Sequence, residues 1–80
     1  MNHLEIWTAI ERFASELNLT CSGLAKKSGL DATTFNRSKR FSRDGQPRWP
    51  STQSIAKILK YSGQSMEAFT KHLRAKEPQI

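Results

Sequence analysis

The stretch 24-LAKKSGLDATTF-35 decides the fold expected for this chain, because it places a helix end and a new helix start within a few residues. Gly29 accepts the left-handed backbone conformation that ends many helices and turns the chain sharply. Asp31 follows two positions later and is a good N-cap for a further helix, which we expect to run from Ala32 to Lys39. Ala25 is small enough for the two helices to cross closely. Three larger apolar side chains would fill the core beneath them: Leu24, Leu30 and Phe35.

A helical pattern precedes this stretch. Asn2 and Glu5 are spaced as a capping box, and apolar residues then recur every three or four positions, which predicts a helix over residues 3–17. Thr20 is a good N-cap for a second helix over residues 21–28. The residues expected on the inward face of the first helix are Leu4, Ile6, Trp7, Ile10, Phe13, Ala14 and Leu17.

The C-terminal half predicts two more helices after an irregular loop. Residues 41–50 combine Asp-Gly with two prolines and show no helical period, which is typical of a loop. Ser51 or Thr52 would cap a fourth helix that ends at Gly63, and Ser65 would cap a fifth. Their inward residues would be Ile55, Ile58 and Leu59, then Met66, Phe69 and Leu73. The expected architecture is all-α, with five short helices in one domain over residues 1–74 and a tail or linker stub over residues 75–80.

Length and composition restrict the classes of protein to which the chain can belong. Its 80 residues, 36% of them hydrophobic, supply one modest core. The mean hydropathy is −0.64, and no apolar run approaches the roughly 20 residues that a membrane helix needs. The N-terminus lacks the basic start and apolar stretch of a signal peptide, and a single cysteine cannot form a disulfide within the chain. We expect a cytoplasmic protein without a membrane partner.

Residues suited to catalysis or metal binding are sparse. Cys21, His3 and His72 lie far apart in sequence and offer neither zinc-ligand spacing nor a nucleophile with its base. A glycine-rich phosphate loop is also absent from the sequence. The sequence therefore predicts no enzyme, no metal site and no cofactor, and Cys21 is expected to be a small helix residue.

The positive charge is concentrated in the middle of the chain. The formal net charge is +6 at pH 7. Residues 1–20 carry three glutamates and one arginine, whereas residues 26–48 carry seven lysines and arginines and two aspartates. An acidic first helix beside a basic middle indicates a surface that attracts polyanions. A basic surface that serves only solubility is the alternative interpretation of the same charges.

The organisation around residues 24–35 resembles the helix-turn-helix of Cro/cI-type (lambda-repressor-like) domains, with the unit over residues 21–40. The small residue, the glycine and the apolar positions agree with that family in type and spacing. The runs 34–40 and 48–51 are more specifically similar to the N-terminal domains of phage-repressor regulators that carry a LexA-like peptidase domain. The resemblance covers residues 4–74. It departs from the family at Ser38, where an apolar residue is usual, and in the long loop over residues 41–50.

This resemblance implies sequence-specific binding of double-stranded DNA by a transcriptional regulator of the phage-repressor type. The helix that begins at Ala32 would enter the major groove, while the preceding helix would cross the backbone. The base-reading positions would be Ala32, Thr33, Thr34, Asn36 and Arg37. Among them, Arg37 is best suited to pair with guanine O6 and N7. Phosphate contacts would come from Thr20, Ser22, Lys26, Lys39, Arg40, Arg43 and Arg48.

The resemblance also implies partners. A homodimer would read a two-fold symmetric operator, and a C-terminal peptidase-like domain would lie outside these residues. A protein-interaction or antitoxin module that uses the same fold is the alternative, although such a module needs no basic face around Arg37 and Arg40. Trp49 has two interpretations as well: it pins the loop to the domain, or it stacks on a sugar or base of the DNA.

Overall fold

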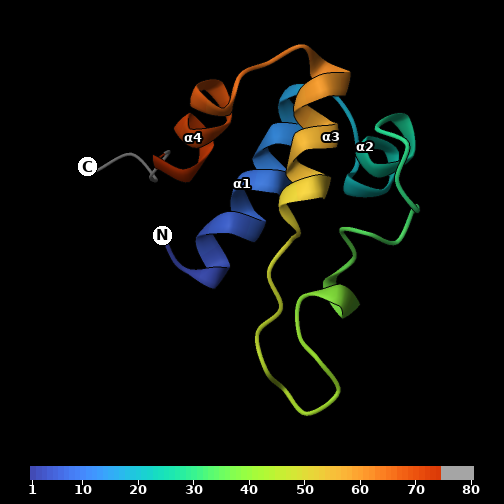
Figure 1. Cartoon of the computed structure of the whole chain (residues 1–80), viewed down its shortest axis with the longest axis vertical. Helices are drawn as coiled ribbons and strands as arrows, with labels where there is room; N and C mark the ends of the chain where they lie inside the picture. Colours follow the sequence, from blue (N-terminus) through green and yellow to red (C-terminus); the bar gives the residue numbers. More distant parts are fainter. Residues whose placement is uncertain (75–80) are drawn as a thin grey trace.

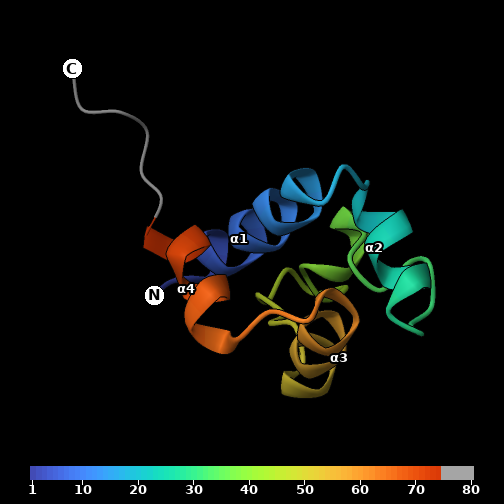
Figure 2. The ribbon, with the colours of Figure 1, turned by 90° about the horizontal axis from the view of Figure 1, so that it is seen from above.

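The computed structural model describes residues 1–74, and four α-helices make up most of this range. The helices are α1 (His3–Glu16), α2 (Cys21–Lys27), α3 (Thr52–Ser62) and α4 (Met66–Arg74) (Figure 1). Seen from above, α1 lies between α4 and α2, and α3 packs against α2 (Figure 2). Within residues 1–74 the β-structure is limited to one isolated bridge, between Phe41 and Pro47, so the all-α expectation is confirmed. The predicted tail over residues 75–80 lies outside the described residues.

Four of the five predicted helix N-caps are confirmed; Asp31, the fifth, has no helix to cap. The Glu5 amide donates to Asn2 Oδ1 and the Asn2 amide donates to Glu5 Oε1, both at 2.8 Å, which completes the capping box of α1. Thr20 accepts from the Gly23 amide at 3.0 Å at the start of α2. Ser51 and Ser65 do the same for the first turns of α3 and α4, at 3.0 and 3.1 Å. These bonds satisfy amides that have no partner within their own helix.

One apolar core joins the helices. Phe13 of α1 meets Phe69 of α4 edge to face, with ring centroids 5.6 Å apart. The buried apolar residues are Ile6, Trp7, Ala9, Ile10, Phe13, Ala14, Leu24, Ala25, Phe35, Ile55, Ile58 and Phe69. Two residues that were predicted to face the core do not: Leu4 is 72% exposed and Met66 is 53% exposed. Both lie in the first turn of their helices, and Leu4 borders an open hollow there.

The prediction of a third helix over Ala32–Lys39 is wrong. Residues 32–35 form a turn, Asn36 is extended with φ −66° and ψ 152°, and a single 3-10 turn, η1, spans Arg37–Lys39. The described residues thus contain four α-helices and one short 3-10 helix rather than five α-helices. Gly29, with φ +78°, ends α2 as expected, but no α-helix follows it until α3.

Local hydrogen bonds explain why the third helix does not form. Asp31 Oδ1 accepts from the Thr33 amide at 2.8 Å and from Thr33 Oγ1 at 2.6 Å. The Asp31 carbonyl accepts from the Thr34 amide at 3.0 Å and from Thr34 Oγ1 at 2.7 Å. In an α-helix this carbonyl would instead accept from the amide of Phe35. Short polar side chains of this kind compete with the helical bonding pattern, and here they close two tight turns.

The loop over residues 41–50 projects from one end of the helical body (Figure 1). Its two arms are joined by bonds from the Ser42 amide to the Gln46 carbonyl and from the Arg48 amide to the Arg40 carbonyl, both 2.8 Å. Gly45 makes the reversal with φ +85°. The loop therefore has the form of a short hairpin, with its two arms joined by backbone hydrogen bonds.

The first turns of α1 hold the base of this loop. The buried Trp7 donates its Nε1 hydrogen to the Arg48 carbonyl at 3.0 Å. His3 Nε2 lies 2.8 Å from the Arg40 carbonyl oxygen and donates to it in the tautomer that carries a hydrogen on Nε2. The His3 ring also contacts Phe41 and Trp49, with centroids 4.8 and 6.1 Å away. Trp49 thus touches the domain through its edge, yet 50% of it remains exposed.

The Arg40 side chain extends into the body of the protein. Its guanidinium carbon lies 5.0 Å from the centroid of the Trp7 ring. Nη2 pairs with Glu11 Oε2 at 3.0 Å and donates to the Phe35 carbonyl at 3.3 Å. Only 13% of the side chain is exposed. Arg40 therefore ties α1 and the turn over residues 32–35 to the start of the loop.

Gly29→Ala should lower the free energy of unfolding by about 1 kcal/mol, because an L-residue is strained at positive φ. No atom lies within 4 Å of the added Cβ, so the cost is one of backbone conformation. A synthetic chain with D-alanine at position 29, which favours positive φ, is the matched control and should be at least as stable as the natural chain. Urea denaturation would measure both changes, and equal stabilities for the two alanine enantiomers would contradict this account of the turn.

Arg40→Met should lower the free energy of unfolding by about 1–3 kcal/mol, because it removes the contact with the Trp7 ring and the pair with Glu11 while keeping an apolar stem. Arg43→Met makes the same chemical change in the exposed part of the loop and should shift stability by less than about 0.5 kcal/mol. Thermal unfolding of the two variants gives the comparison. Similar losses would mean that Arg40 has no special structural role.

Candidate nucleic-acid interface

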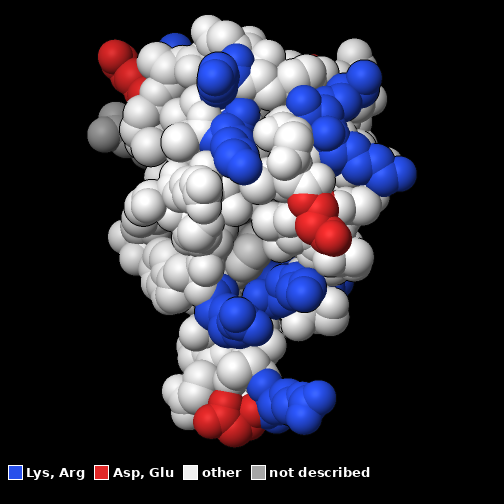
Figure 3. Space-filling view, turned by 45° about the vertical axis from the view of Figure 1, so that its right-hand side comes forward, with Lys and Arg blue, Asp and Glu red and all other residues white. Residues whose placement is uncertain are grey.

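A basic face covers α2, α3 and the base of the loop. In Figure 3, Lys and Arg side chains gather above, to the right of and below a hollowed area, with one acidic side chain between the right-hand and lower groups. The cations come from the last turn of α2, from α3, from η1 and from the second arm of the loop: Lys26, Lys27, Lys57, Lys60, Lys39 and Arg48. In the part of the chain that is described, none of the six forms an ion pair with a carboxylate. Their charges are available to a partner.

A hollow of about 460 Å³ lies between the turn over residues 32–35, the base of the loop and the start of α3. We call it the threonine hollow, and the lining residues that matter here are Asp31, Thr33, Thr34, Lys39, Arg48 and Trp49. It combines two cations, two threonines and a half-exposed aromatic ring. The fold thus brings together Thr33, Thr34, Lys39 and Arg48, four residues that the sequence assigned to base or phosphate contact.

Asp31 places a negative charge beside these cations. Hydrogen bonds from the Thr33 side chain and amide, followed by a smaller effect of Lys39, hold the pKa of this exposed carboxyl below its ordinary value of 3.8. The carboxylate is therefore ionised at neutral pH, and one of its oxygens is already engaged by Thr33. An anion in the threonine hollow would have to contact Lys39 and Arg48 on the side away from Asp31.

Arg37 is separated from the other predicted base-reading residues. A 3-10 helix turns about 120° per residue, so Arg37 and Lys39 leave η1 in different directions. Arg37 lines a hollow of about 280 Å³ together with Leu4 and Phe41, and it does not line the threonine hollow. Asn36 is exposed and Ala32 half-buried in the same segment. The predicted base-reading set is thus divided between two sides of the 31–39 segment.

The predicted phosphate-contact residues also differ in how they are placed. Thr20 uses its hydroxyl to cap α2, and Ser22 is half-buried beside it. Arg43 is exposed near the tip of the loop, where it neighbours Asp44 in sequence. Arg40 was expected to contact phosphate, but its guanidinium is turned inward to Glu11 and Trp7. We therefore leave Arg40 out of the candidate interface.

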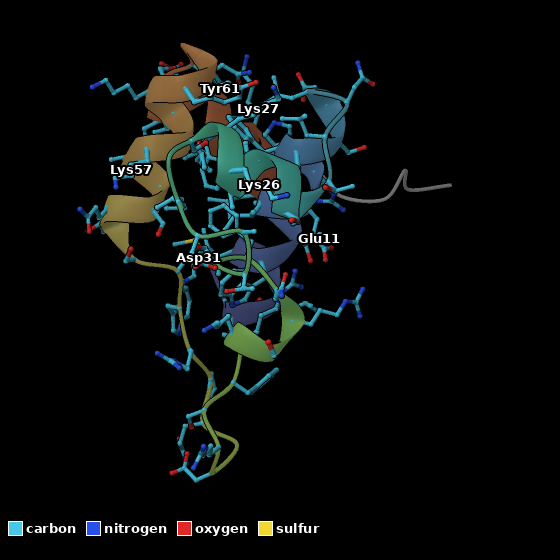
Figure 4. All side chains as sticks on the ribbon, turned by 90° about the vertical axis from the view of Figure 1, so that its right-hand side faces the viewer. Glu11, Lys26, Lys27, Asp31, Lys57 and Tyr61 are labelled. Atoms are coloured by element: carbon cyan, nitrogen blue, oxygen red, sulfur yellow. The ribbon has the colours of Figure 1, made fainter. Side chains whose placement is uncertain are left out.

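Sequence reasoning left two residues of the interface unassigned. Lys57 and Lys60 of α3 line a third hollow, of about 490 Å³, with Lys27, Ser28, Gly29 and Tyr61. Figure 4 shows Lys27 and Tyr61 side by side where α2 and α3 approach each other, with Lys57 nearer the start of α3. The spacing of Lys57 and Lys60 on one helix face is visible in the sequence, but their proximity to Lys27 depends on how α2 packs on α3.

Other kinds of site have little support in the described residues. Burial, together with the nearby Glu11 carboxylate, raises the pKa of the Cys21 thiol, which disfavours the reactive thiolate at neutral pH. No group of three or more potential metal ligands occurs within residues 1–74. None of the described helices combines the length and the apolar character needed to cross a bilayer.

Comparisons with known proteins add no assignment to this geometry. No family model, no curated protein and no solved structure matches the chain. The resemblance to Cro/cI-type domains is therefore still a prediction from the sequence.

Proposed function

We propose that this protein binds double-stranded DNA through the basic face of α2, α3 and the base of the loop. The observation that carries the proposal is the threonine hollow, where Lys39 and Arg48, both without a carboxylate partner among the described residues, flank Thr33 and Thr34. Cations of this kind neutralise phosphates, whereas hydroxyl and methyl groups of threonine can contact base edges. Composition alone does not distinguish this surface from a soluble basic protein, but the clustering of charges around one hollow favours a polyanion.

The 31–36 turn is the part of the surface proposed to face the groove. A continuous recognition helix is not available there, so Thr33, Thr34 and Asn36 would be presented by two tight turns fixed by Asp31. Lys39 and Arg48 would contact the flanking phosphates. The exposed part of Trp49 would lie against a sugar or base at the edge of the same hollow.

A transcriptional regulator of the phage-repressor type, with a Cro/cI-type helix-turn-helix fold, is the finer form of this proposal. It rests on the sequence resemblance, of which the structure retains α2 and the turn at Gly29. A single surface of this size reads only a few base pairs, so a homodimer on a two-fold symmetric operator would supply the remaining specificity. A peptidase-like domain in the natural protein would lie outside these residues.

A protein-interaction module is the second candidate, and a different observation favours it. Leu4 and Phe41 are both large and more than half exposed, and they line the same hollow as Arg37. Exposed apolar residues beside an arginine are typical of protein interfaces. Failure of the natural chain to bind any duplex at 50 mM salt would favour this second candidate.

Arg48→Gln and Lys39→Gln should each weaken binding to duplex DNA and reduce the slope of log affinity against log salt by about one unit, because each removes one phosphate contact. The carbonyl and amide of Arg48, not its side chain, hold the loop, so the fold should survive the substitution. Lys71→Gln on α4 removes the same charge from outside both basic hollows and is the matched control. Fluorescence anisotropy with a labelled duplex pool would measure the slopes, and indistinguishable values for all three variants would contradict the proposed surface.

Arg37→Ala tests on which side of the 31–39 segment the DNA lies. Because Arg37 lines the hollow with Leu4 and Phe41, its replacement should affect duplex affinity less than Arg48→Gln does. Base selection from a random duplex pool should also stay the same. A loss of about 1–3 kcal/mol on the selected sequence, with relaxed choice at one base pair, would instead identify Arg37 as the base-reading residue.

A further inference from the structure

The hollow between the end of α2 and the last two turns of α3 contains an unusual concentration of positive charge. Three lysines line it, and the residues around its volume of about 490 Å³ are Lys27, Ser28, Gly29, Lys57, Lys60 and Tyr61. No carboxylate is among them. Three cations that line one hollow repel one another, and a bound anion would offset that repulsion.

Compensation of helix dipoles explains only part of this cluster. Lys27 lies in the last turn of α2 and Lys60 in the last turn of α3, where a cation offsets the partial negative charge of the helix end. Lys57 lies earlier in α3 and gains nothing from that effect. Its position beside the other two lysines therefore needs a different explanation.

A buried hydroxyl gives the second independent observation. The Ser28 Oγ atom is shielded from solvent and has no hydrogen-bond partner among the described residues, although Ser28 lines this hollow. A buried polar atom without a partner costs free energy, and rotation of the Ser28 side chain toward the hollow would let its hydroxyl donate to a ligand acceptor and remove that cost. Tyr61 adds a second hydroxyl to the lining.

We propose that Lys27, Lys57 and Lys60, with the hydroxyls of Ser28 and Tyr61, form a binding site for a phosphate group. Ammonium groups only donate hydrogen bonds, and a hydroxyl can donate one, so the lining matches a ligand that is rich in acceptors and negatively charged. The phosphate comes either from the backbone of a duplex that also contacts the threonine hollow, which rests on the proposed function, or from a small phosphorylated molecule. The two sources share this chemistry and are separated by experiment.

The test uses the full chain with Lys57→Gln and Lys60→Gln, each compared with Lys71→Gln on α4. In one arm, amide chemical shifts of labelled protein are followed during titration with sodium pyrophosphate. In the other arm, duplex affinity is measured between 50 and 200 mM salt. Urea denaturation of each variant establishes that the fold is intact, and Lys60 is the safer position because it is exposed whereas Lys57 is half-buried.

For a backbone phosphate, each α3 variant should bind duplex more weakly than the Lys71→Gln variant. Its salt slope should be smaller by about 0.9, so that the advantage of the natural chain falls about 3.5-fold from 50 to 200 mM. For a small phosphorylated ligand, duplex binding should match the control, while pyrophosphate shifts at residues 27–29 and 57–61 should be lost in the α3 variants only. Unchanged results in both arms would overturn the site. Absence of duplex binding by the natural chain, with pyrophosphate shifts retained, would overturn the proposed function and leave the phosphate site standing.

Discussion

The hydrogen bond from Trp7 Nε1 to the Arg48 carbonyl is the contact on which the geometry of the candidate interface depends. Trp7 belongs to the core of α1, so the bond joins the most buried part of the fold to the base of an exposed loop. His3 and Arg40 reinforce it from the two sides, through the Arg40 carbonyl and through the face of the Trp7 ring. Arg48 and Lys39 can flank the threonine hollow because these three residues fix the course of the backbone between them.

Local signals in the sequence predicted most of the helical elements. Several helices start or end through hydrogen bonds between residues only a few positions apart, as at Asn2, Thr20, Ser51 and Gly63. Such bonds can be predicted from the sequence without knowledge of the fold. The prediction of a third helix was wrong for a related reason. Asp31 does accept from the Thr33 amide, as an N-cap would, but the adjacent threonines use the Asp31 carbonyl for a tight turn instead of continuing the helix.

The candidate site was less predictable, because its geometry comes from contacts between distant segments. Charge density favoured a partner-binding surface within residues 26–48, and the fold places Lys39 and Arg48 of this segment around one hollow. Arg40 looks equally suitable in sequence, but the ring of Trp7 and the carboxylate of Glu11 turn it inward. Lys57 and Lys60 had no local signal that distinguished them from solvated charges. Only the packing of α3 against α2 places them near Lys27.

The hydrogen bonds that hold the base of the loop affect the order in which parts of this protein fold. The bonds from His3 to Arg40 and from Trp7 to Arg48 join residues 37 and 41 positions apart, whereas the helices close contacts of three or four positions. Long closures carry a larger entropic cost and form after local structure in a folding chain. These bonds lie at the end of the helical body from which the loop projects, and a segment at such an end can open locally without unfolding of the helices. The helices can therefore persist in a state in which the threonine hollow has already come apart, and helical content alone is a poor measure of how much protein has this hollow intact.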